Sequence, residues 1–172
     1  MLFSIVHEIG HIIAGIILKM KPEKIEIMPF GLSVSFYANI DNNTIKEIIV
    51  SLAGPIMSLV LAILLSKIDL KIISMQEAVY SNILIFLFNV IPIYPLDGGR
   101  ILKGILHIIL GEAKSKNAVN KISNMTIIIL TVISSIAVYY YKNIAIYLVC
   151  IFLWSLCLKE KNDKTLAILQ GK

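Results

Sequence analysis

Charged residues are scarce in this sequence. Only 16% of its 172 residues are Asp, Glu, Lys or Arg, whereas 58% are hydrophobic. A water-soluble domain carries charge on about a quarter of its residues, so an ordinary soluble domain is excluded. We expect residues 1–172 to form a single membrane-embedded domain.

Cysteine is also rare, and the basic residues are not clustered. Cys150 and Cys157, the two cysteines, lie in the last apolar stretch without C-x-x-C spacing, which excludes a disulfide framework and a cysteine zinc site. The net charge of +5 is spread between apolar segments, so we expect no nucleic-acid partner. The first apolar segment follows no basic residues and therefore does not read as a cleavable signal peptide.

Five apolar segments have about the length that a helix needs to cross a bilayer. They cover residues 1–18, 48–66, 78–96, 122–141 and 143–158. The expected fold class is therefore an all-α polytopic membrane protein with about five transmembrane helices.

Three further segments have different patterns. Alternating apolar and polar residues over 24–41 predict a short β-hairpin, which is either a covering loop or an edge that receives an extended peptide by strand addition. Residues 100–118 mix apolar and basic side chains, as in an amphipathic helix lying in the membrane interface. Residues 159–172 are polar and basic, and we expect them to form a cytoplasmic tail.

Lysine and arginine are unevenly divided between the two sides that these spans define. Thirteen fall on the side of the hairpin and the C-terminus, whereas Lys67, Lys71 and Lys142 fall on the other. Basic loops are retained in the cytoplasm. We therefore expect a multi-pass protein whose C-terminus is cytoplasmic.

Three ionisable side chains, His7, Glu8 and His11, interrupt the first apolar segment. Such a residue costs about 2.5–3.5 kcal/mol at the centre of a spanning helix, so a function is the default interpretation. Helix positions i and i+4 share a face, so both imidazoles can bind one ion while Glu8 reaches the bound water. This is the H-E-x-x-H pattern of zinc hydrolases. The alternative is a pair of interfacial histidines with satisfied hydrogen bonds.

A catalytic zinc usually has three protein ligands and an open position, so one ligand is still to be found. The segment 78–96 ends in Pro92 and Pro95, which should unwind or kink the helix, and Asp97 follows. Non-helical backbone at membrane depth is tolerated where it is buried in protein or lines a wet cavity. Asp97 lies at a compatible depth on the cytoplasmic side, and it is our candidate third ligand.

Two side chains are candidates for the catalytic chemistry. Glu8 would take a proton from the attacking water and pass it to the leaving amine. Asn89 would hold the substrate backbone or stabilise the developing oxyanion, or it would merely cap unwound backbone.

His7-Glu8-x-x-His11 and Asn89-x-x-Pro92-x-Tyr94-Pro95-Leu96-Asp97-Gly98 resemble the two motifs of the site-2 proteases, the intramembrane zinc metalloproteases of peptidase family M50. The resemblance covers roughly residues 1–110. It implies that His7, His11 and Asp97 bind one Zn²⁺ per chain and that Glu8 is the general base. Asn89 matches the asparagine of the second motif.

The second motif looks most like the sporulation branch, which releases a late sigma factor from a membrane-tethered precursor. The resemblance implies a metalloendopeptidase of the bacterial cell membrane that cleaves in or near a membrane-associated segment. Its substrate would be a pro-sigma factor or another membrane-tethered regulator, and membrane inhibitor proteins would be further partners. Met1 stands six residues before His7, so the first helix is expected to be incomplete or the true start to lie upstream.

Two other functions are considered. A membrane-anchored zincin would need a Glu or His as its third ligand on a later helix, and no spanning segment offers a convincing one. A non-catalytic membrane protein that retains the protease fold to bind metal or clients would be marked by loss of Glu8, and Glu8 is present.

Overall fold

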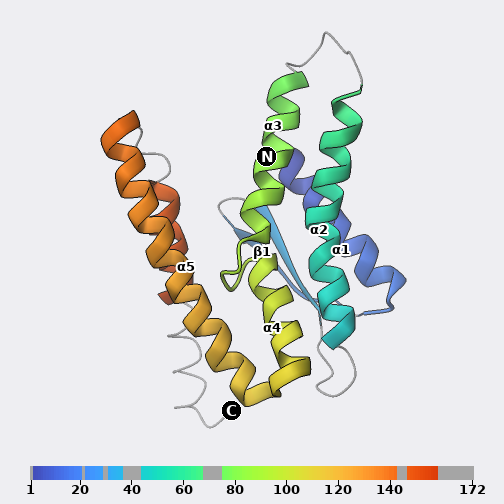
Figure 1. The fold of residues 1–172 in the computed structure, drawn as a ribbon. Helices are drawn as coiled ribbons and strands as arrows, with labels where there is room; N and C mark the ends of the chain where they lie inside the picture. The colour runs from blue at the N-terminus through green and yellow to red at the C-terminus, as the bar shows by residue number, and fades with distance from the viewer. Residues whose placement is uncertain are drawn as a thin grey trace.

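The computed structural model describes residues 2–20, 22–28, 31–36, 44–67, 75–142 and 147–158. Its elements in chain order are α1 (Leu2–Ile17), β1 (Pro22–Met28), β2 (Gly31–Phe36), α2 (Thr44–Leu65), α3 (Met75–Val90), α4 (Asp97–Leu110) and α5 (Glu112–Tyr141), and a helix over Tyr147–Leu158 follows (Figure 1). The predicted tail, 159–172, lies outside the described residues.

α2 packs against α1, α3 and α4, and α5 packs against α4. α3 and α4 follow one another along the bundle, and α5 starts beside α4 and runs back in the opposite direction (Figure 1). Large apolar side chains cover the outward faces, among them Ile56 and Ile63 of α2 and Ile129 and Ile133 of α5. Apolar outward faces are the arrangement that a lipid environment requires.

The predicted set of five spans is only partly reproduced. Among the described residues, Thr44–Leu65 and Glu112–Tyr140 are long and apolar enough to cross a membrane, and Phe3–Ile17 and Tyr147–Leu158 are shorter apolar helices. The span predicted over 78–96 is too long, because α3 ends at Val90.

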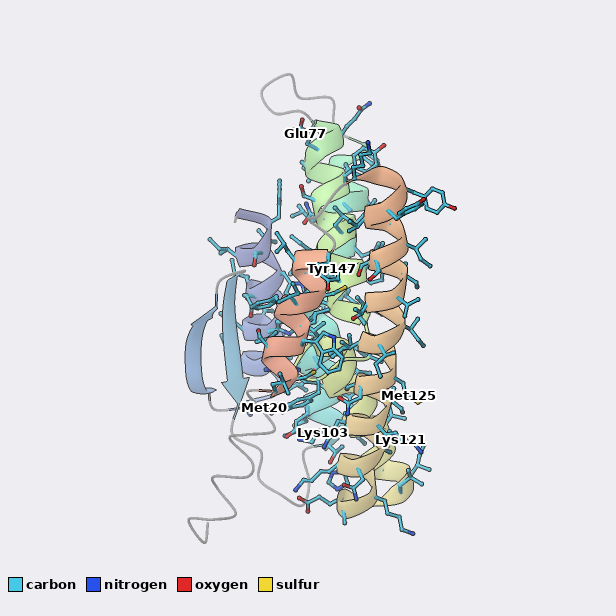
Figure 2. All side chains as sticks on the ribbon, turned by 90° about the vertical axis from the view of Figure 1, so that its left-hand side faces the viewer. Met20, Glu77, Lys103, Lys121, Met125 and Tyr147 are labelled. Carbon is cyan, nitrogen blue, oxygen red and sulfur yellow. The ribbon has the colours of Figure 1, made fainter. Side chains whose placement is uncertain are left out.

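β1 and β2 form a two-stranded antiparallel sheet in which Ile25 is opposite Val34 and Met28 is opposite Gly31. These strands occupy most of the region in which the hairpin was predicted, and residues 29–30 and 37–41 of that region lie outside the described residues. β2 packs beside α1, at the side of the bundle (Figure 2).

The chain between α3 and α4 is not helical, because Pro92 and Pro95 cannot donate helical hydrogen bonds. Its polar groups find partners on the last two helices instead. The Tyr94 N–H donates to the Ser123 hydroxyl at 3.1 Å, and the Cys157 thiol donates to the Tyr94 carbonyl at 3.3 Å. The unwound segment is therefore partly buried and hydrogen-bonded to the last two helices, as backbone at membrane depth requires.

The same segment contributes to the hydrophobic core. Ile93 is completely buried and packs in one cluster with Ile127 of α5 and Leu153 of the last helix. Trp154 joins these two helices by donating its indole N–H to Thr131. α5 and the last helix thus hold the segment that leads directly into Asp97.

The amphipathic helix predicted over 100–118 is wrong in its bounds. α4 ends at Leu110 and α5 begins at Glu112, with Gly111 at a φ of +80° between them. That backbone region favours glycine and interrupts a right-handed helix, so the chain turns there. Residues 112–118 consequently belong to α5, which starts ten residues before the span predicted at 122–141.

Replacing Ser123 with alanine should destabilise the fold, because the partly buried Tyr94 N–H would lose its acceptor. We expect the free energy of unfolding in detergent micelles to fall by about 1–3 kcal/mol. Ser134→Ala is the matched control, since the buried Ser134 hydroxyl donates only to Thr131 within α5. Equal stability of the two variants would show that the Tyr94 contact is dispensable.

Candidate metal centre

α1 presents two histidine side chains on one face of the helix. His7 and His11 are one helical turn apart, and their exposed fractions are 3% and 6%. Their ring centroids lie 4.9 Å apart, and their Nε2 atoms are separated by 3.2 Å. The i and i+4 spacing therefore brings both imidazoles to one buried point, as predicted.

Asp97 reaches the same point from the first residue of α4. Its Oδ2 atom lies 3.0 Å from Nε2 of His7 and 3.1 Å from Nε2 of His11. The aspartate is itself buried. Three side chains singled out from the sequence thus converge, although α1 and α4 are far apart in the chain.

The donor atoms of this cluster fit zinc. Imidazole nitrogen and carboxylate oxygen are common zinc ligands, and three of them leave a fourth position free. His11 Nδ1 must donate to the Val50 carbonyl, 2.7 Å away, because a carbonyl oxygen only accepts. A neutral His11 ring then turns its Nε2 lone pair toward Asp97, an arrangement that suits a cation between them.

α2 contacts both imidazole rings at their Nδ1 atoms, on the side opposite Asp97. His7 Nδ1 lies 3.0 Å from the Ser58 hydroxyl, and His11 Nδ1 is bonded to Val50 of the same helix. Partners of this kind fix the tautomer and orientation of ligating histidines. Neither Val50 nor Ser58 was singled out from the sequence, because a backbone carbonyl or a lone serine in an apolar run carries no distinctive signal.

Gly54 is the point of closest approach between α2 and the cluster. A Cβ atom placed there would lie 2.2 Å from His11 Nε2 and 2.8 Å from His7 Nε2. Any side chain at this position would therefore occupy the space between the imidazoles and α2. Glycine at this position therefore lets α2 approach the two histidines closely.

Glu8 lies at the edge of the cluster and is half-buried. One ligand atom from each of His7, Glu8 and His11 can be chosen so that all three lie within 4.8 Å of one another. The carboxylate is therefore close enough to act on a molecule bound at the histidines.

Asn89 lies in the last turn of α3 and is half-buried. Its amide nitrogen donates to the Ile85 carbonyl, one turn earlier in the helix, at 3.0 Å. This contact is of the structural kind that the sequence left open for Asn89. A catalytic role for this side chain stays a prediction.

Gly54→Ala should abolish tight zinc binding, because the added methyl group overlaps both Nε2 positions. We expect the zinc dissociation constant to rise at least about tenfold, the lower end of what loss of supporting contacts costs a metal site. Gly104→Ala is the control, since its Cβ would meet the side chains of Ile48, at 2.5 Å, and Thr44, at 3.6 Å, away from the cluster. Chelator competition on both purified variants measures the difference, and unchanged affinity in Gly54→Ala would contradict the geometry.

Known proteins share this arrangement of sequence and fold. The family model for Peptidase family M50 matches residues 67–133, which include Asn89 and Asp97. A zinc metalloprotease of Methanocaldococcus jannaschii is 29% identical over 158 residues, covering 87% of this chain and 44% of the relative. Stage IV sporulation protein FB of Bacillus subtilis is 26% identical over 106 residues, covering 59% of this chain and 37% of that protein. The chain spans less than half the length of these curated relatives.

The fold matches a solved structure as well. The site-2 protease from Methanocaldococcus jannaschii superposes with a TM-score of 0.72 and 26% sequence identity, covering 92% of this chain and 74% of that chain. These matches point to the same proteins as the two sequence motifs and the meeting of the two histidines with the aspartate. In its two motifs and in its fold, the chain is similar to the site-2 proteases and to peptidase family M50.

Proposed function

We propose that this chain is an intramembrane zinc metalloprotease, a metalloendopeptidase that hydrolyses a peptide bond in or near a membrane-associated segment of its substrate. The observation that carries the proposal is the meeting of Asp97 Oδ2 with both histidine Nε2 atoms, within 3.1 Å, beside a half-buried Glu8. Relatives named as zinc metalloproteases support the choice of metal and of reaction.

His7, His11 and Asp97 would hold one zinc ion per chain. Zinc held there would supply a Lewis acid that polarises the scissile carbonyl and makes water acidic enough to attack at neutral pH. Glu8 is the base: its carboxylate takes the proton from the attacking water and delivers it to the nitrogen of the leaving amine. Ser58 and the Val50 carbonyl keep the two imidazoles in place meanwhile.

Asn89 is proposed to hold the substrate backbone or the developing oxyanion. It stands one residue before the end of α3, where the unwound segment begins. The amide carries a second N–H besides the one bonded to Ile85, and this second donor is available in principle for a carbonyl oxygen.

We place the protein in the bacterial cell membrane as a multi-pass protein with a cytoplasmic C-terminus. Lys103 and Lys121 lie toward one end of the bundle and Glu77 lies at the other (Figure 2). This distribution supports the basic end as the cytoplasmic one. The strand pair beside α1 is next to the helix that carries the histidines, as strand addition by an extended substrate would require.

A pro-sigma factor, or another membrane-tethered regulator, is the proposed substrate, and membrane inhibitor proteins are proposed as further partners. The support is the likeness of the Asn89–Asp97 motif to the sporulation branch. The match to a protein named stage IV sporulation protein FB points the same way.

Cleavage of a co-expressed pro-sigma factor, with zinc content measured on each purified protein, tests the assignment of roles. Glu8→Gln should retain zinc and lower cleavage by at least about 100-fold, because the general base is lost. Asp97→Asn should lose zinc and cleavage together. Glu112→Gln is the matched control, since this exposed glutamate pairs only with Lys116 in the contacts described.

The outcomes separate the parts of the proposal. A Glu8→Gln variant as active as wild type would overturn the protease mechanism, and zinc binding without any cleavage would favour the non-catalytic alternative. Cleavage of another membrane-tethered regulator, but not of a pro-sigma factor, would leave the protease and reject the sporulation substrate.

A further inference from the structure

One face of α2 is matched in spacing to the histidine face of α1. Val50, Gly54 and Ser58 recur every four residues, as His7 and His11 do, so each set lies along one side of its helix. Val50 and Ser58 contact the two Nδ1 atoms, and Gly54 lies against both Nε2 atoms. Two turns of α2 therefore contact both imidazole rings.

The Val50 carbonyl and the Ser58 hydroxyl differ in how they constrain the tautomer of the histidine that each contacts. The Val50 carbonyl oxygen can only accept, so His11 Nδ1 must carry a proton whatever side chain stands at position 50. The Ser58 hydroxyl can donate or accept, so it permits either tautomer of His7 until another contact decides. Ser58 is completely buried, and bulk water does not reach it as a substitute partner.

The contacts of the other ring nitrogen, Nε2, determine which tautomer of His7 is present. This Nε2 atom lies 3.0 Å from Asp97 Oδ2 and 3.2 Å from His11 Nε2. For Nε2 to offer a lone pair to a metal ion at this point, the proton of the neutral ring must reside on Nδ1. The Ser58 oxygen is then the acceptor of that proton's hydrogen bond.

We propose that Ser58 is a positioning residue of the metal centre: its hydroxyl oxygen accepts a hydrogen bond from His7 Nδ1 and thereby holds the ring with Nε2 directed toward Asp97 and His11. The residue acts through His7 and touches no substrate. The inference rests on the proposed zinc site, and it names a requirement of that site outside the two motifs.

Zinc affinity measured by chelator competition tests this role. Ser58→Ala should raise the zinc dissociation constant about 10- to 100-fold, the usual cost of removing a partner of a ligating histidine. Ser58→Thr retains the hydroxyl and should restore most of the affinity. Ser134→Ala, which removes an equally buried serine hydroxyl from α5, should bind zinc as wild type does.

A second readout separates positioning from general packing. The sequence has three histidines, so zinc-loaded protein labelled with ¹⁵N-histidine gives few ring N–H signals. In Ser58→Ala the His7 Nδ1–H signal should move and exchange faster with water, whereas the His11 signal should stay, because its acceptor is a backbone carbonyl. This comparison needs only the alanine variant and decides the matter even where threonine does not fit.

Zinc affinity of Ser58→Ala within twofold of wild type would overturn the proposal. Equal changes at His7 and His11 would also overturn it, since they would indicate a shifted helix instead of a lost contact. Wild-type protein that binds no zinc would overturn the proposed metal site as well, whereas wild-type binding with an unaffected Ser58→Ala variant would overturn this inference alone.

Discussion

The contact of Asp97 with His7 and His11 is the constraint on which the rest of the structure depends. Polar side chains buried in an apolar bundle are costly unless they are paired and hydrogen-bonded. The two histidines and the aspartate pair with one another, and α2 supplies partners for the remaining ring nitrogens. α1, α2 and α4 therefore cannot move past one another without breaking buried polar contacts.

A second requirement comes from the unwound chain that delivers Asp97. Because Pro92 and Pro95 end α3, the backbone between α3 and α4 needs partners from elsewhere. Ser123 and Cys157 provide them, and Ile93 anchors the segment between α5 and the last helix. The last two helices are thus coupled to the metal centre through the chain they hold, although none of their side chains belongs to the cluster of His7, His11 and Asp97.

The sequence predicted the convergence of His7, His11 and Asp97, because helical spacing and membrane depth constrain charged residues strongly. It could not predict Ser58 and the Val50 carbonyl as partners, since a serine or a peptide group in an apolar run carries no distinctive signal. The end of α4 and the start of α5 were misjudged because the positive φ of Gly111 separates two helices within a stretch whose composition alone shows no break. The number of spans was inferred from apolar length alone, and α3 shows that proline shortens such a run.

X-ray absorption spectroscopy of the zinc-loaded protein tests the central claim most directly, because it counts and identifies the ligands. We expect one zinc per chain with two imidazole nitrogens at about 2.0–2.1 Å, together with oxygen ligands from a carboxylate and solvent. Asp97→Asn should alter the oxygen shell and leave the imidazole signature in whatever zinc remains bound. A spectrum without two imidazoles in the wild-type protein would contradict the account.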